Sequence, residues 1–248
     1  YTFRVDDFAT KGKNYAVPVV LSQVTKGNIE MSKSQSSYIY ILSIPLKVSV
    51  PVLKGVGGDQ VNRLKVRPDD AWGLEMKKFT VEAWARMSGY TKNNKAFFDF
   101  GSPNYKTYIR FGNANRPYNY VHVNAWKNLI QTPSDLVGGI WYHWAFVYDG
   151  AEMIIYRNGE FLMKYTMTTP ASYTMNFFGM VSSGPSYFID QGSFSQVRLW
   201  KTALTQAQIQ NGMYYSVNPE NPNREAYWPM DEGEGTEFKD ITGNGHDA

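Results

Sequence analysis

The stretch from Asn113 to Trp126 (NANRPYNYVHVNAW) holds side chains suited to binding a sugar. A sugar packs its C–H face on an aromatic ring, while amide and guanidinium groups bond its hydroxyls. The nearby segment from Gly101 to Tyr108 (GSPNYKTY) holds the same residue types. The predicted ligand-binding residues are Tyr105, Asn115, Arg116, Tyr118, Asn119, Tyr120 and Trp126. The alternative is that these tyrosines simply cover an edge of a sheet.

A site of this kind is expected to be weak. Covering roughly 100 Å² of sugar C–H surface with a ring contributes about 2.5 kcal/mol at about 25 cal/mol/Å². Such a contribution corresponds to millimolar affinity, where the binding free energy is about −4 kcal/mol. Useful capture then requires several sites or a neighbouring binder.

Hydrolysis of a glycosidic bond by a retaining enzyme needs two carboxylates about 5 to 5.5 Å apart. On a strand, residues two or four positions apart meet this need, because only they share a face. The densest acidic cluster consists of Asp231, Glu232, Glu234 and Glu237. Gly233 and Gly235 interrupt it and favour a turn over a strand. We therefore predict no enzyme and no catalytic residue; a remote glycosidase would require two facing carboxylates.

The three histidines offer little further chemistry, and the chain has no cysteine. His143 has no acidic or nucleophilic residue beside it in W-Y-H-W, which favours a packing role over a general base. The other two histidines, His122 and His246, are far away in sequence. The chain has no cysteine, which excludes disulfides, zinc–thiolate sites and thiol catalysis.

One segment near the end of the sequence resembles the start of a calcium loop. Asp240, Thr242 and Asn244 place oxygen-bearing side chains at alternate positions, and Gly245 permits a sharp turn. The glutamate that closes an EF-hand is missing. The favoured alternative is an Asx turn, in which Asp240 accepts a hydrogen bond from its own backbone. Asp240 and Asn244 remain the candidate calcium ligands, and no other metal or cofactor is expected.

Composition narrows the class of protein. The chain has 248 residues, 43% hydrophobic and 19% charged, which suffices for the core of one or two domains. A net charge of +3 without a run of Lys and Arg argues against nucleic acid binding. The longest apolar run, Tyr38 to Val52, is shorter than the roughly 18 to 20 residues of a membrane helix. The first residues have the character of the middle of a folded unit, so any targeting signal is expected to precede Tyr1.

Strands must position these residues. Phe79 to Met87 (FTVEAWARM) places Phe79, Val81, Ala83 and Ala85 on one face, and it is followed by strands at 96–100, 107–111 and 118–126. Strands at 15–24 and 38–50 precede a glycine-rich linker at 52–59, where we expect a domain boundary. Many short strands and almost no helix predict a β-sandwich of jelly-roll type, with function on its open face and end loops.

Turn and cap residues add detail. Asp149-Gly150 and Asn158-Gly159 favour type I′ turns, which make residues 141–167 a meander of three antiparallel strands. Thr205 and Gln208 have the spacing of a capping box, which predicts a short helix.

Four segments occur in the order typical of one family. They are FTVEAWARM (79–87), WYHWAFVYDGAEMIIYRNGE (141–160), FSQVRLWKTALTQAQI (194–209) and AYWPMDEGEGTEFKDITGNGHDA (226–248). Over residues 57–248 the chain resembles the laminin-G-like, concanavalin-A-like jelly-roll domains. The first fifty residues resemble the end of a small β-sandwich module found in surface lipoproteins of gut Bacteroidetes. The predicted fold is all-β, with a partial small β-sandwich at 1–54 and a laminin-G-like jelly-roll domain at 55–248.

The resemblance implies a function. Proteins with this pairing are similar to accessory lipoproteins encoded beside SusC/SusD-like outer-membrane importers. It implies a non-catalytic lipoprotein on the cell surface that captures glycan for the importer, held by a lipid anchor outside this sequence. The alternative is an assembly subunit of such an importer that handles peptides and has no sugar site. The E-x-D-x-x-E strand of jelly-roll glucanases does not occur here, and the resemblance assigns Arg198, Trp200 and Trp228 to packing.

Overall fold

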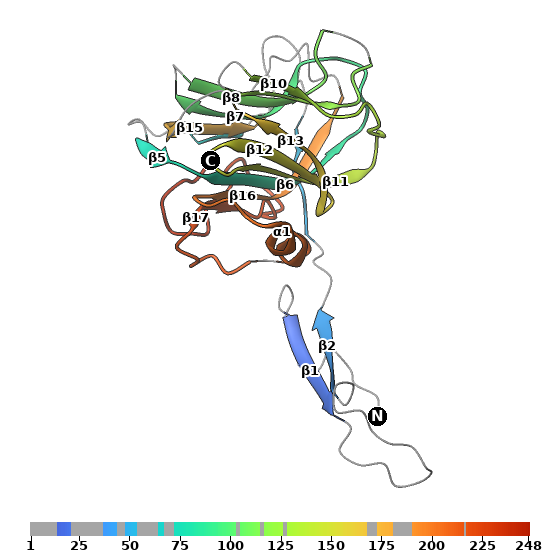
Figure 1. Ribbon diagram of the computed structural model, residues 1–248, viewed down its shortest axis with the longest axis vertical. Coiled ribbons are helices and arrows are strands. Elements are labelled where there is room, and N and C mark those ends of the chain that lie inside the picture. Colours follow the sequence, from blue (N-terminus) through green and yellow to red (C-terminus); the bar gives the residue numbers. More distant parts are fainter. Residues whose placement is uncertain are drawn as a thin grey trace. The chain divides into compact units, whose positions relative to one another are not determined.

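The structure is a computed structural model, and about half of its described residues are in antiparallel strands, with one short helix among these residues (Figure 1). It describes residues 14–20, 37–43, 48–53, 64–66, 72–102, 105–114, 117–125, 128–167, 173–180, 190–215 and 217–248. The chain divides into two compact units. The first comprises Tyr1–Lys47 and Tyr214–Val217, and the second comprises Val48–Met213 and Asn218–Ala248.

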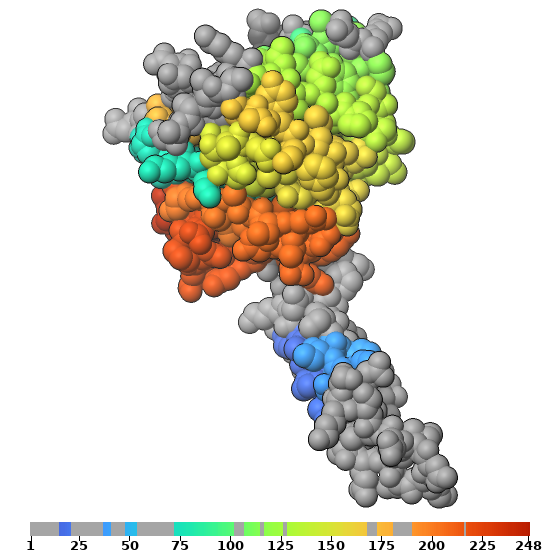
Figure 2. Space-filling view, viewed as in Figure 1, coloured from blue at the N-terminus to red at the C-terminus, as the bar shows by residue number. Residues whose placement is uncertain are grey.

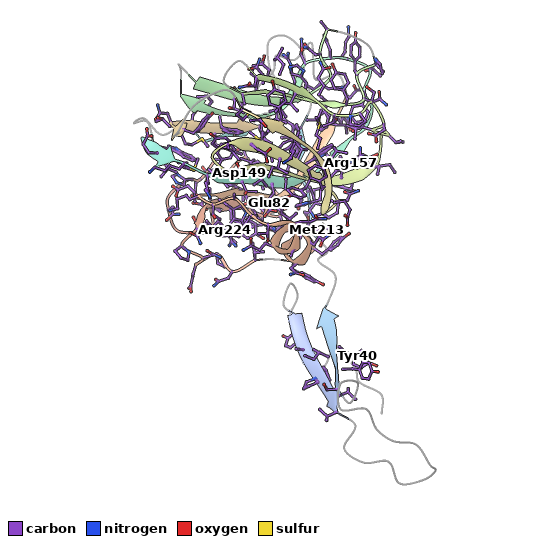
Figure 3. The ribbon with its side chains drawn as sticks, in the orientation of Figure 1. Tyr40, Glu82, Asp149, Arg157, Met213 and Arg224 are labelled. Atoms are coloured by element: carbon purple, nitrogen blue, oxygen red, sulfur yellow. The ribbon has the colours of Figure 1, made fainter. Side chains whose placement is uncertain are left out.

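In the first unit, β1 (Asn14–Val20) pairs with β2 (Ser37–Ser43) as an antiparallel ribbon. Both strands are rich in Val, Ile and Tyr, which favour extended backbone. Pro18 donates no hydrogen bond, and a two-stranded ribbon tolerates it because each strand has one unpaired side. Tyr40, labelled in Figure 3, is among the exposed large side chains of β2.

The second unit contains a larger and a smaller sheet. The larger sheet has the order β13-β12-β11-β6-β16-β17, with β3 added beside β16. Its strands are β3 (Val52–Leu53), β6 (Phe79–Met87), β11 (Trp141–Tyr148), β12 (Glu152–Arg157), β13 (Glu160–Thr166), β16 (Gly192–Trp200) and β17 (Arg224–Trp228). The pairing of β3 with β16 and the burial of Leu53 join this segment to the larger sheet. The compact units accordingly divide after Lys47, whereas the sequence predicts a division after residue 54.

The smaller sheet has the order β10-β9-β8-β7-β15-β4. Its strands are β4 (Leu64–Val66), β7 (Lys95–Ser102), β8 (Tyr105–Phe111), β9 (Val121–Ala125), β10 (Asn128–Gln131) and β15 (Phe177–Met180). A separate pair joins β5 (Leu74–Met76) to β14 (Tyr173–Met175). All pairings are antiparallel, as a sandwich built from hairpins and long crossovers requires.

Aromatic side chains from both sheets fill the core. Phe98 of the smaller sheet meets Phe146 of the larger edge-on, with ring centroids 6.3 Å apart. Phe178 stacks on Trp228 with centroids 5.1 Å apart. Each such side chain contributes about 1.5–3 kcal/mol when fully buried. The predicted concanavalin-A-like β-sandwich is confirmed.

The alternation predicted for residues 79–87 is confirmed, since Phe79, Val81 and Ala83 are fully buried in the core. Thr80 and Glu82, on the opposite face of β6, are buried as well. This outer face of the larger sheet is covered by α1 (Gln206–Gly212) and the residues beside it. In the space-filling view, the orange region that contains α1 adjoins the yellow strands β12 and β13 (Figure 2).

The predicted meander of β11, β12 and β13 is confirmed, but its two turns differ. Asn158 and Gly159 have φ of 54° and 77°, as a type I′ turn requires. At the first turn Gly150 has a positive φ of 103° and Asp149 does not, so the type I′ prediction is wrong there. Asp149 Oδ1 instead accepts hydrogen bonds from the backbone of Ala151 and Glu152, 2.8 and 2.7 Å away, an arrangement that replaces the predicted turn.

The capping box is confirmed. Thr205 Oγ1 accepts a hydrogen bond from Gln208 N, and Gln208 Oε1 accepts one from Thr205 N. The helix begins after Thr205 and buries only Ile209. In the part of the chain that the structure describes, no helix has the length and apolar character of a membrane span.

Candidate functional site

Loops at one end of the sandwich line an open cleft of about 280 Å³. The first loop follows β6 and spans 88–94, and the second follows β8 and includes 117–120. A third loop, 132–140, braces the second from outside. The residues that line the cleft are Tyr90, Thr91, Pro117, Tyr118 and Asn119, and we call it the loop cleft.

Tyr90 presents a phenol from the first loop. Its ring packs edge-on against Phe111 of β8, with centroids 5.5 Å apart, and Lys95 Nζ lies 5.5 Å from the centre of the ring. Burial raises the pKa of Tyr90 above its usual value, and the nearby Tyr142 and Asp190 add to this increase. The hydroxyl therefore stays protonated near neutral pH and can donate or accept a hydrogen bond.

Thr91 is held in place by a buried ion pair behind the loop. Asp190 accepts hydrogen bonds from Thr91 N and Thr91 Oγ1, at 2.8 and 2.9 Å, and forms an ion pair with Lys95. Burial raises the pKa of Asp190, but the bonds from Lys95 and Thr91 outweigh it and hold the pKa below its usual value. The wall formed by the first loop is therefore rigid, and its buried charges neutralise each other.

Gly112 determines the position of Tyr118. The glycine has φ of +67°, and a Cβ placed there would lie 2.9 Å from Tyr118 Cβ. Its backbone N–H donates to Tyr120 O at 2.9 Å, and its carbonyl accepts from Asn94 N at 3.2 Å. A side chain at position 112 would displace Tyr118, so the glycine permits both the turn and the close approach.

Asn119 connects the second loop to the third. Its Nδ2 donates to Leu136 O at 3.1 Å and to Ser134 O at 3.3 Å. Its backbone carbonyl accepts from Leu136 N at 3.1 Å. The side-chain Oδ1 has no hydrogen-bond partner among the described residues. Asn119 thus fixes this wall of the cleft, and its Oδ1 is buried. The two phenols of the cleft supply the hydrogen-bonding chemistry that hydroxyl groups require.

The structure brings together two of the predicted binding residues, Tyr118 and Asn119. Tyr120, which directly precedes β9, is 5% exposed and does not line the cleft. The side chain of Tyr105, in β8, lies outside what the structure describes, as do Asn115, Arg116 and Trp126. Sequence reasoning missed Tyr90 and Thr91, although a short loop with Gly89 and an aromatic residue between two predicted strands indicates such a place.

The candidate calcium ligands are engaged with the protein. Asp240 Oδ1 accepts from Thr242 N at 3.1 Å, which is the favoured Asx turn, and from Tyr227 N at 3.0 Å. Asn244 Nδ2 donates to Glu225 O at 2.8 Å. Calcium binding by Asp240 and Asn244 stays a prediction. Within the described ranges, no group of three His, Cys, Asp or Glu side chains has the arrangement of a metal site.

The acidic cluster lies in a turn, as the sequence predicts. Gly233 and Gly235 have φ of +82° and +86°, and the side chains of Asp231 and Glu232 are exposed. Glu232 Oε1 accepts a hydrogen bond from Lys239 N at 2.9 Å. A retaining glycosidase of this fold would need two carboxylates on one face of a strand. The carboxylates of this cluster lie in a turn and do not have that arrangement.

His143 acquires an acidic neighbour that the sequence did not predict. Its Nε2 lies 3.5 Å from Glu82 Oε2 on the adjacent strand β6, and Trp84 packs edge-on against its ring, with centroids 5.3 Å apart. Burial lowers the pKa of His143 to about 4, although Glu82 opposes this shift. The imidazole is 1% exposed and remains neutral near pH 7, as expected of a packing residue.

Comparison with known proteins agrees with this architecture. A laminin G model described as the concanavalin A-like lectin/glucanases superfamily matches residues 59–210. The chain belongs to this superfamily. A comparison with curated proteins gives no match.

Solved structures share the fold at low sequence identity. A candidate carbohydrate-binding protein from Bacteroides ovatus is 22% identical, with a TM-score of 0.67, over 95% of this chain and 66% of its own. The binding domain of botulinum neurotoxin serotype G is 11% identical, with a TM-score of 0.51, over 80% of this chain and 46% of its own.

Proposed function

We propose that this protein is a non-catalytic carbohydrate-binding protein that holds a sugar in the loop cleft. The observation that carries the proposal is the combination of Tyr90, Tyr118 and Asn119 in the lining of one cleft. One phenol ring takes the C–H face of the sugar, and the phenol oxygens bond its hydroxyls. The lectin-like superfamily and the similarity to the Bacteroides protein support the same class of ligand.

The charges around the cleft favour an uncharged sugar. Lys95 is paired with Asp190, and Arg157 is paired with Asp135 through two hydrogen bonds of 2.5 and 2.8 Å. The described lining of the cleft itself contains no charged residue. An anionic sugar would therefore find no free cation in this lining.

We further propose that the protein is a lipoprotein of the outer membrane, exposed at the cell surface, that delivers glycan to a SusC/SusD-like importer. A weak site gains useful affinity when a second protein binds the same glycan molecule. The importer would be that second binder. The assembly-subunit alternative predicts stable association with the importer and no glycan binding. Extraction in mild detergent, with mass spectrometry of the proteins that remain bound, tests the partnership separately from the sugar site.

The sugar site is tested on a glycan array, with isothermal titration of the best ligand. Tyr118→Ala removes a stacking ring and should weaken binding at least about tenfold, which corresponds to about 1.4 kcal/mol. Tyr165→Ala is the matched control, because Tyr165 is an exposed tyrosine on β13 far from the cleft in sequence. Equal binding by both variants and the wild type would contradict the proposed site.

A further inference from the structure

A second polar surface lies on the outer face of the smaller sheet. The strand register places Tyr108 opposite Asn124 and Arg110 opposite His122, and places His122 opposite Gln131. Because side chains alternate along a strand, these residues share the face opposite to the buried Ile109 and Val123. We call this surface the polar platform; it consists of Tyr108, Arg110, His122, Asn124 and Gln131. None of its residues lines the loop cleft.

Internal contacts hold the platform in shape. Asn124 Nδ2 donates to the Tyr108 hydroxyl at 2.8 Å, and the Arg110 guanidinium lies 4.6 Å from the centre of the Tyr108 ring. Arg110 Nη2 donates to Asn113 Oδ1 at 2.9 Å. The guanidinium is thus fixed by a neutral acceptor and an aromatic face, and it remains partly exposed. A cation held in this way loses little conformational freedom when it binds an anion.

Arg110 carries the partly exposed charge of the platform. It forms no ion pair with any residue that the structure describes, whereas Arg157 and Arg198 are paired with Asp135 and Glu82. Burial, together with the charge of Arg110, lowers the pKa of His122 to about 4, so His122 is neutral near pH 7. The register also places Asp99 of β7, which is 3% exposed, opposite Tyr108 on the same face, so Arg110 supplies the charge that is partly exposed there.

The platform also has more donors than acceptors. Arg110 Nε and His122 Nε2 are buried without hydrogen-bond partners. Gln131 Nε2 lies 3.4 Å from His122 Nδ1, which places the proton of the neutral ring on Nε2 when Gln131 donates. Both of these atoms are enclosed by protein, so the group of the platform that a ligand can reach is the partly exposed remainder of the Arg110 guanidinium, which favours negatively charged oxygen.

We propose that the polar platform binds the carboxylate of an acidic sugar, such as a uronic acid residue of a polysaccharide. The Arg110 guanidinium is partly exposed, and its N–H groups that Asn113 does not use can donate to a carboxylate. Asn124 and Gln131 supply amide groups for the neighbouring hydroxyls, and the Tyr108 ring borders the same surface. A sugar fits better than an acidic peptide, because the five platform residues are polar and the exposed Leu129, opposite Asn124 on the same face, is a single apolar side chain rather than a groove for peptide side chains.

Two matched probes test the charge requirement. Tetragalacturonate carries a carboxylate on every sugar ring, and its methyl ester keeps the rings but removes the charges. Isothermal titration of the whole chain should give at least about tenfold tighter binding of the acid than of the ester. Raising the salt concentration should weaken binding of the acid and leave binding of the ester unchanged.

Variants then assign the site. Arg110→Gln should lose at least about tenfold in affinity for tetragalacturonate. Arg110→Lys should recover part of this affinity, because lysine restores the positive charge but not the planar set of N–H groups of the guanidinium. Arg86→Gln is the matched control, since Arg86 is an exposed arginine on β6 of the other sheet. Thermal unfolding of each variant shows whether it is folded. The NMR signals of the side-chain amides of Asn124 and Gln131 should shift when tetragalacturonate is added.

Several outcomes would overturn the proposal. No binding of tetragalacturonate, equal binding of acid and ester, or unchanged binding by a folded Arg110→Gln variant would each do so. Binding of a polyglutamate peptide through Arg110, without binding of tetragalacturonate, would replace the sugar by an acidic protein partner. The Tyr118→Ala variant should retain binding of the acid, so failure here and failure of the loop cleft are distinguishable.

Discussion

The outer faces of the two sheets carry similar side chains and differ in what covers them. On the larger sheet, Glu82 Oε1 accepts from Arg198 Nη1 at 3.1 Å and from Trp200 Nε1 at 2.9 Å. All three residues are buried. Figure 3 labels Glu82 together with Met213, whose carbonyl accepts from Trp84 Nε1 at 2.7 Å. On the smaller sheet, Arg110 is partly exposed and has no carboxylate partner among the described residues.

This difference separates a structural role from a recognition role. A charge that is removed from water must be paired, because an unpaired buried ion costs several kcal/mol. The charges beneath α1 meet this requirement and are not available to a ligand. A partly exposed cation is solvated by water and can remain unpaired until an anion binds. Residue type alone therefore does not reveal the role of an arginine on a sheet face.

The largest expected effect is that of Glu82→Ala. The substitution leaves the buried Arg198 without its counter-charge, so the free energy of unfolding should fall by about 3–5 kcal/mol. Urea denaturation measures the loss. Glu152→Ala is the control, because Glu152 pairs with Lys164 at the surface, and should cost less than about 1 kcal/mol. Equal losses in both variants would remove the distinction between covered and open faces.

The role of α1 as the cover of the larger sheet is tested by Ile209→Ala. Ile209 is the buried residue of α1, and its truncation should lower the free energy of unfolding by about 2–5 kcal/mol. The helix should also loosen, which amide hydrogen exchange over residues 206–212 would detect. Unchanged exchange with unchanged stability would mean that α1 is not what protects the Glu82–Arg198 pair.

A smaller effect is expected on lowering the pH. Burial lowers the pKa of His143 from 6.5 to about 4, so the unfolded chain takes up a proton near pH 6.5 and the folded chain does not. Stability should therefore fall as the pH decreases from about 6.5 to 4, by at most about 1.4 kcal/mol per pH unit for this group. Denaturation curves between about pH 7.5 and 5 measure the slope, and His143→Asn should reduce it. His122, which has a similar shift, continues to contribute in that variant. A slope that is identical in the variant and the wild type would contradict the assignment to His143.

The smallest expected effect on stability is that of Arg110→Gln. The guanidinium is partly exposed and pairs with no carboxylate of the described residues, so the free energy of unfolding should change by about 0.5 kcal/mol or less. Arg198→Gln is the matched variant on the covered face and should cost several times more, because Glu82 then loses its cation. A large loss for Arg110→Gln would place the polar platform among the structural networks.

Local patterns were enough to predict much of the fold. The alternation at 79–87, the meander at 141–167 and the Thr205 capping box each depend on residues close in sequence. The site depends on contacts that no local pattern contains. Tyr118 and Asn119 were predicted, but Tyr90 joins them only because two loops meet at the same end of the sandwich.

The same limit applies to the buried charges. Glu82 and His143 are adjacent because β6 and β11 pair with His143 opposite Trp84, a register that depends on the whole sheet. The Asp149 turn was misjudged because its side chain, rather than a positive φ, satisfies the local backbone.

The most direct test of the account is an NMR titration with the neutral glycan that binds best on the array. If the loop cleft holds the sugar, the backbone amides of Tyr90, Thr91 and Asn119 should shift together, and Tyr118→Ala should abolish the shifts at the same glycan concentration. Shifts confined to other parts of the second unit, or shifts that persist in the folded variant, would contradict the central claim that this cleft binds carbohydrate.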